Sequence, residues 1–181
     1  MNTIAFINLN PHHLLISSLN ITFLQGSAVE LQGLLEVAVY VHATEDESKV
    51  IKAISNVLPK DIYEKMSFEK VKAKGHYGNP INILKASIRV DDLKALSKYI
   101  LDRMESYDKE YIRRSLERFV DSTGTIYFRF DKQEAYLGRI VLKSSDPICV
   151  RLKFDIPPGR GIGPVEYIRG ILFEEIHRSP R

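Results

Sequence analysis

The sequence predicts an α+β domain in which an antiparallel sheet carries helices on one face. Two observations support this class. Four segments alternate apolar and polar residues in the manner of half-buried strands, namely 34–43, 84–90, 125–130 and 148–154. Apolar residues recur at helical spacing after Thr44 and again after Asp92. At 181 residues, of which 44% are hydrophobic, the chain has enough apolar material for a single core.

Residues 1–28 differ from the rest of the chain. They contain no Asp, Glu, Lys or Arg, and the first basic residue is Lys49. A secretory signal would place positive charge before its apolar run, and none is present. We hypothesise that residues 1–28 are a weakly ordered extension translated from a misassigned start, with a tail that contacts a partner or a membrane as the alternative. Residues 29–181 then form one α+β domain.

The domain is predicted to begin with the strand 34–43, which buries every second residue. Thr44 and Glu47 have the spacing of a capping box, so they predict the start of a helix. Pro59 ends the helical pattern.

A basic hairpin is predicted next. Lys70, Lys72 and Lys74 occupy every second position and would line one side of a strand, while Lys85 and Arg89 lie opposite the apolar positions of the following strand. We therefore expect both strands to direct their positive charge the same way. The alternative is an ordinary hairpin with a solvated lysine face.

The rest of the chain continues this alternation. Asp91 and Asp92 suit the N-terminus of a second helix, and a third helix is predicted over 108–120. Strands at 125–130 and 148–154 flank a single helical turn within 131–138 and a weaker strand at 140–142. Pro164 has the character of the first residue of a last helix.

The outward positions of the predicted strands are mostly basic, with an aromatic residue among them. A surface of this kind is typical of RNA-binding proteins, because cations neutralise phosphates and aromatic rings stack on unpaired bases. His76 and Tyr77 join the set at the tip of the hairpin, and Tyr77 and Tyr127 are the stacking candidates. The candidate contacts are Lys70, Lys72, Lys74, His76, Tyr77, Lys85, Arg89, Tyr127, Arg129, Arg151 and Lys153.

Other classes of function find less support. A single cysteine, Cys149, excludes an internal disulfide and a multi-cysteine zinc site, and it fits a reducing, cytoplasmic compartment. No apolar run approaches the ~20 residues of a membrane span. The histidines lack the spacing of metal ligands, so we expect no metal, no cofactor and no enzyme activity. The alternative is a nuclease that uses His76 with Asp131 and Lys132 for acid–base chemistry.

Three segments carry a family resemblance: GHYGNPINILK at 75–85, FDKQEAYLG at 130–138 and SDPICVRLKF at 145–154. They resemble an archaeal family of small RNA-binding domain proteins described as predicted exosome subunits, and the resemblance extends over residues 34–154. It implies a fold similar to that of the ribosomal protein that binds 5S rRNA, with a mixed, mostly antiparallel sheet and helices packed on one face. It also implies RNA as a partner, and exosome components through RNA processing or degradation.

The resemblance adds candidate contact or fold-defining positions at Gly75, His76, Tyr77, Gly78, Asn79, Asp131, Lys132 and Gln133. Among these, Lys132 joins the candidate RNA contacts. A protein-interaction module remains the alternative function. Such a module would form a homodimer, or dock on a complex, through a sheet edge or through the basic face.

Overall fold

The computed structural model describes residues 31–75, 79–157 and 161–173. Its strands are β1 (Gly33–His42), β2 (Glu69–Lys74), β3 (Pro80–Val90), β4 (Thr125–Phe130) and β5 (Ile148–Phe154). Its helices are α2 (Glu47–Val57), α3 (Lys60–Tyr63), α4 (Leu93–Asp102), α5 (Ser106–Arg114), the 3-10 helix η1 (Leu116–Arg118), α6 (Lys132–Tyr136) and α7 (Pro164–Phe173). The predicted extension at residues 1–28 lies outside the described residues.

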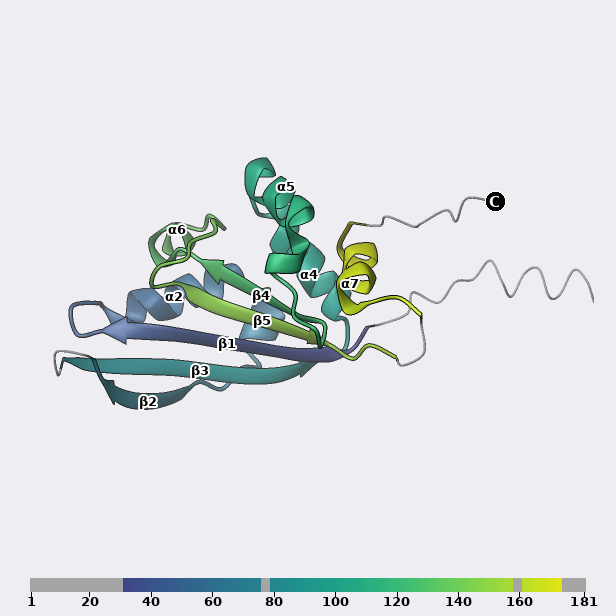
Figure 1. Ribbon diagram of the computed structural model, residues 1–181. Coiled ribbons are helices and arrows are strands. Elements are labelled where there is room, and N and C mark those ends of the chain that lie inside the picture. Colours follow the sequence, from purple (N-terminus) through teal and green to yellow (C-terminus); the bar gives the residue numbers. More distant parts are fainter. Residues whose placement is uncertain (1–30, 76–78, 158–160, 174–181) are drawn as a thin grey trace, which may run out of the picture.

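The strands form one sheet in the order β2-β3-β1-β5-β4 (Figure 1). All neighbouring strands in this sheet run antiparallel. A parallel pairing occurs at the isolated bridge between Met104 and Ile140, outside the sheet. The α+β class is thus confirmed, with a sheet that is more uniformly antiparallel than the resemblance implied.

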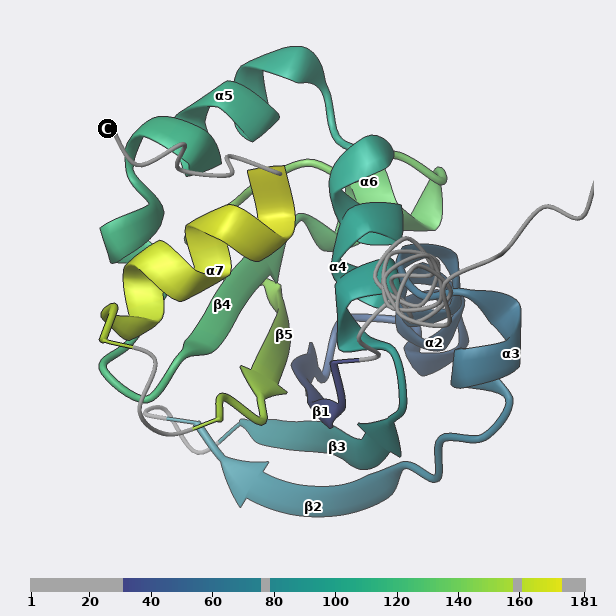
Figure 2. The same ribbon diagram turned by 90° about the vertical axis from the view of Figure 1, so that its right-hand side faces the viewer.

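The hydrophobic core lies between the sheet and the helices. Leu35, Val37 and Val39 of the central strand β1 are buried, and Val37 pairs with Ala86 on one side and Val150 on the other. Figure 2 shows α2 and α4 together on one side of β1 and β3. Each such buried aliphatic side chain stabilises the fold by about 1.5–3 kcal/mol.

Helix starts agree with the sequence only in part. The side chain of Asp92 caps α4 by accepting from the amide of Ala95 at 2.9 Å, and Pro164 is the first residue of α7, as expected. The predicted capping box at Thr44 is wrong: Asp46 caps α2 by accepting from the amide of Ser48 at 2.9 Å. The third predicted helix divides into α5 and η1. Within the described residues, no helix is long and apolar enough to cross a membrane.

Candidate nucleic-acid interface

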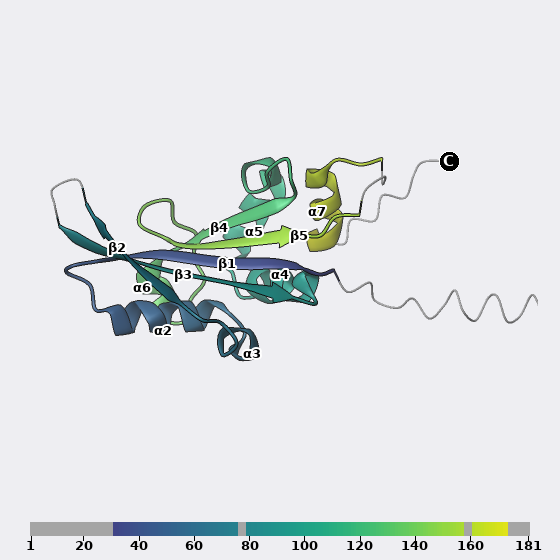
Figure 3. The same cartoon turned by 90° about the horizontal axis from the view of Figure 1, so that it is seen from below.

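The sheet has one face without helices on its central strands, which we call the open sheet face. Figure 3 shows α2 and α3 together on the opposite side of β1 and β3. Strand register defines the members of the open sheet face, because directly paired residues point to the same side. Lys85 on this face pairs with Ala38, which in turn pairs with Cys149.

Five predicted cations share the open sheet face: Lys85, Arg89, Arg129, Arg151 and Lys153. Arg89 forms an ion pair with Asp155, and Arg151 lies 3.8 Å from the carboxylate of Glu36. Among the described residues, no carboxylate forms an ion pair with Lys85, Arg129 or Lys153. These three side chains therefore remain available to an external anion.

The lysines of β2 do not belong to this face, so the expected shared basic stripe is wrong. The register pairs Lys70 with Leu84 and Lys72 with Asn82, and it pairs Lys74 with Pro80. Leu84 is buried beneath the helices, so the lysines lie on the helix side of the sheet. The Lys70 Nζ contacts Glu47 of α2 at 2.6 Å.

The physical reason is the pairing offset between β2 and β3. Counting alternate positions within each strand groups the lysines correctly, but the register decides which group faces which side. Here Glu69, not a lysine, lies opposite Lys85 on the open sheet face. His76, Tyr77 and Gly78, at the predicted tip of the hairpin, lie outside the described residues. At its base the Gly75 amide donates to the Asn79 carbonyl at 2.8 Å.

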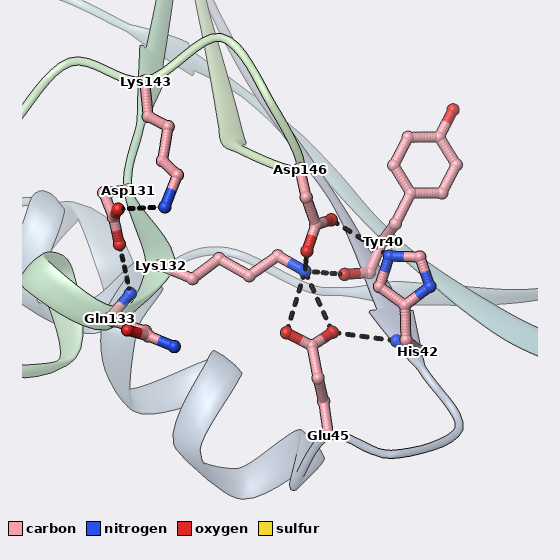
Figure 4. Close-up of polar contacts among 8 residues, drawn as sticks. All are labelled: Tyr40, His42, Glu45, Asp131, Lys132, Gln133, Lys143 and Asp146. Carbon is pink, nitrogen blue, oxygen red and sulfur yellow. Dashed lines mark hydrogen bonds and ion pairs between the residues drawn. The ribbon is translucent and has the colours of Figure 1, made fainter.

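Lys132 is buried rather than presented to solvent, which contradicts its assignment as a surface contact. Its side chain is 8% exposed, and its ammonium lies between the carboxylates of Glu45 and Asp146 (Figure 4). The Nζ donates to Glu45 Oε2 at 2.9 Å, to Asp146 Oδ2 at 2.8 Å and to the Tyr40 carbonyl at 2.6 Å. His42 completes this group, the Lys132 cluster, with its Nε2 3.2 Å from Asp146 Oδ1.

The Lys132 cluster holds segments that are far apart in sequence. It joins the end of β1 and the loop before α2 to the first turn of α6 and to the loop before β5. The donor atoms of His42, Glu45 and Asp146 lie within 4.8 Å of one another, a spacing that would suit a metal ion. The Lys132 ammonium contacts both carboxylates and offsets one of their two negative charges, which accounts for their close approach.

Asp131 has a comparable structural task. Its Oδ1 accepts from the amides of Gln133 and Glu134 at 2.7 and 3.1 Å and so caps α6. Its Oδ2 pairs with Lys143 (Figure 4). Burial opposes ionisation of this carboxyl, but the Lys143 ammonium and the two amides hold the pKa of Asp131 below its usual value.

A pocket that strand counting missed lies at the edge of β4, and we call it the β4-edge pocket. It has a volume of about 380 Å³, and its lining includes Tyr111, Arg118, Phe119, Tyr127, Arg129 and Lys143. Backbone pairing explains its position. The Tyr127 amide donates to the Phe119 carbonyl and the Lys143 amide donates to the Arg129 carbonyl, so the segments on either side of the pocket are tied to β4.

The turn before β4 fixes Tyr127. Asp121 Oδ1 accepts from the Thr123 hydroxyl and from the amide of Thr125, and Asp121 Oδ2 accepts from the Tyr127 hydroxyl at 2.8 Å. The Thr123 hydroxyl and the Thr125 amide hold the pKa of Asp121 well below its usual range. Donation to this carboxylate raises the pKa of Tyr127. The guanidinium of Arg151 lies 5.5 Å from the centre of the Tyr127 ring, at cation–π distance.

Tyr111, Arg118 and Lys143 were not predicted, because helical and loop residues cannot be assigned to a sheet face by alternation. Their signal in the sequence is weak: α5 is rich in charged and tyrosine residues without a strong apolar stripe. Tyr111 is 39% exposed and packs edge-on against Phe119, with ring centres 5.7 Å apart. Only the fold brings this helix beside Tyr127.

A second hollow lies over the middle strands of the open sheet face. It has a volume of about 510 Å³, and its floor includes the small side chains of Ala38, Ser87 and Cys149. Charges of both signs surround it, with Glu36 and Glu69 beside Lys85 and Arg151. An anion would therefore meet less positive potential here than at the β4 edge.

Comparisons with known proteins show which proteins this chain resembles. A family model described as RNA binding matches residues 35–154. The RNA-binding protein PAB1135 of Pyrococcus abyssi is 34% identical over 138 residues, which cover 75% of this chain and 90% of that protein. The crystal structure of AF2318 from Archaeglobus fulgidus, of family DUF54, is 33% identical and has a TM-score of 0.65 over 77% of this chain and 99% of that one. The DUF54 protein Mth689 of Methanothermobacter thermautotrophicus is 29% identical with a TM-score of 0.61, over 78% and 98% of the two chains.

Proposed function

The chain belongs to the family whose model, described as RNA binding, spans residues 35–154, and from this premise we propose that it binds RNA through its open sheet face. One observation supports the open sheet face as the RNA site. Arg129 and Lys153 lie on that face beside Tyr127 and form no ion pair with a described residue. Unpaired cations release counterions from RNA when they meet phosphates, and this supplies most of the affinity for nucleic acid.

The test compares two charge reversals of equal size. Arg129→Glu with Lys153→Glu alters the open sheet face, whereas Lys52→Glu with Lys60→Glu alters exposed positions of α2 and α3 behind the sheet. Both double variants change the net charge equally. Fluorescence anisotropy with labelled RNA across a salt series should show that the first pair lowers the slope of log affinity against log salt by about 2, since each lost phosphate contact removes about 1.

The control pair should leave the slope close to that of the unaltered protein. Equal losses in both double variants would mean that net charge alone governs binding, and this would refute the open sheet face as the site. Circular dichroism of each variant should confirm that the domain remains folded.

We propose binding rather than catalysis as the function. The nuclease alternative requires Asp131 and Lys132 to act on RNA together with His76. In the fold, Asp131 caps α6 and pairs with Lys143, and Lys132 is buried between two carboxylates. Both groups are therefore committed to structural contacts. Cleavage of RNA by the purified protein under varied metal conditions would contradict this proposal.

A link to exosome-type RNA processing or degradation is the finer part of the proposal. It is supported by the resemblance of residues 75–85, 130–138 and 145–154 to the archaeal family of predicted exosome subunits. Affinity capture with the tagged full chain should recover exosome subunits from an archaeal extract, and the association should survive ribonuclease if it is direct. A capture that recovers no exosome subunit would refute the link.

A second candidate function is docking of another protein on β2. The observation that favours it is that β2 is an edge strand, and no strand within the described residues pairs with its outer side. An open edge can accept a further strand. Sedimentation of the full chain across a salt series should reveal a dimer if the added strand comes from a second copy, because salt screens the lysines that both β2 strands would carry. A monomer at all concentrations and salt levels would exclude that form of docking.

A further inference from the structure

Four surface hollows can be compared by the charges that line them. Glu36 and Glu69 line the hollow over the middle strands, and Glu45 and Asp46 line the one beside the Lys132 cluster. A third, at the end of β3, includes three aspartates. The β4-edge pocket differs because its lining contains arginine and lysine but no carboxylate. An anionic ligand would meet no like charge in its lining.

The same pocket has an aromatic lining. Tyr111, Phe119 and Tyr127 all contribute to it. Phe119 packs against Phe128 of the core with ring centres 6.5 Å apart, and Tyr111 packs against Phe119. Tyr127 is held by Asp121 and by Arg151. The rings are thus fixed before any ligand arrives, which lowers the entropy cost of binding.

We propose that the β4-edge pocket binds one unpaired RNA base, stacked on Tyr111, with Arg118 and Arg129 on its flanking phosphates. This pocket assignment rests on the proposed RNA-binding function. It adds that the protein prefers single-stranded or bulged RNA over a continuous duplex. A volume of about 380 Å³ lies within the range of small-ligand sites, about 300–1,000 Å³. A base in a continuous duplex is stacked on its neighbours and cannot enter such a pocket.

The pocket continues the open sheet face. Tyr127 and Arg129 line it and also belong to that face, where Tyr127 pairs with Arg151. A strand of RNA that follows the cations Lys153 and Arg151 would therefore reach the pocket without crossing a helix. Tyr111 and Arg118 lie on α5 and η1, outside the sheet. They can be altered while the sheet cations remain in place.

The experiment uses the full chain with two labelled RNA probes of equal length, one single-stranded without secondary structure and one fully paired. The key variant is Tyr111→Ala, accompanied by Tyr111→Leu, which keeps an apolar contact with Phe119 but lacks a π face, and by Tyr111→Phe, which keeps the ring. We expect Tyr111→Ala and Tyr111→Leu to weaken single-strand binding by about 5- to 150-fold, the range for loss of one stacked base. Duplex binding should not change, and Tyr111→Phe should bind like the unaltered protein.

The outcomes separate the two proposals. If the unaltered protein binds neither probe, the proposed RNA-binding function fails and the pocket assignment fails with it. If it binds RNA but Tyr111→Ala and Tyr111→Leu bind the single strand normally, only the pocket assignment is overturned. Equal losses for both probes would also overturn it, because a base pocket must discriminate between them. As a second readout, a single-stranded probe containing 4-thiouridine should photocrosslink to peptides from α5 or β4, and crosslinking elsewhere alone would contradict the pocket.

Discussion

Replacing Lys132 with methionine tests whether the Lys132 cluster is a structural device. Methionine retains most of the length of the side chain but removes the ammonium. The lysine side chain is 8% exposed, whereas the carboxylates that it serves are 28% and 42% exposed. Removing one partner of a fully buried ion pair costs about 3–5 kcal/mol. Because water reaches the two carboxylates, we expect Lys132→Met to lower the free energy of unfolding by about 2–4 kcal/mol.

The assay is urea denaturation followed by circular dichroism at neutral pH. Lys60→Met is a matched control, because its ion pair with Glu64 is exposed and exposed pairs contribute about 0–1 kcal/mol. Adding Glu45→Gln and Asp146→Asn to Lys132→Met should recover part of the loss, since the two carboxylates would no longer repel each other. A loss below about 1 kcal/mol for Lys132→Met would refute the reasoning and show that the cluster is screened like a surface pair.

Three further predictions concern the sheet and its turns. Asp121→Asn should destabilise the domain and loosen Tyr127, whose hydroxyl donates to Asp121. Because the native pKa of Asp121 is lowered, its carboxylate stabilises the fold above about pH 4, and this stabilisation is lost as the pH falls through the native pKa. The difference in unfolding free energy between the variant and the unaltered protein should therefore shrink on acidification, and a constant difference would contradict this. Gly33→Ala should cost about 1–3 kcal/mol in urea denaturation, because the added Cβ would overlap a backbone carbonyl of β5; unchanged stability would contradict that contact. Lys72→Glu should leave the RNA salt slope nearly unchanged, since this lysine lies on the helix side; a loss as large as that of a sheet-face arginine would contradict the register.

The sequence was sufficient to predict the class of the fold and the position of most strands. Alternation identified the core residues of β1, β4 and β5, because a buried face imposes a period of two over the whole strand. It also placed Arg129, Arg151 and Lys153 on one face correctly. These strands are neighbours in the sheet and bury the same face against the helices. Their polar residues must therefore all lie on the opposite face.

The errors have a common physical cause. The orientation of Lys72 depends on the pairing offset across the hairpin, and the burial of Lys132 depends on Glu45, which is 87 residues away along the chain. The orientation of Lys72 and the burial of Lys132 are both set by long-range contacts, and such contacts produce no periodic pattern in the neighbouring sequence. The β4-edge pocket was missed for the same reason, since Tyr111 comes beside Tyr127 only when α5 packs near the edge of the sheet.

The two edge strands of the sheet differ in how their outer backbone groups are covered, and this affects how the protein behaves in concentrated solution. The edge at β4 is partly covered, because backbone groups of Phe119 and Lys143 hydrogen-bond to it. The edge at β2 has no such cover within the described residues, but it carries Lys70, Lys72 and Lys74. Two such edges that met in solution would bring like charges together, which opposes the strand-to-strand aggregation to which open edges are prone. The β2 lysines thus favour solubility, and the protein should become more prone to aggregate as added salt screens their charge.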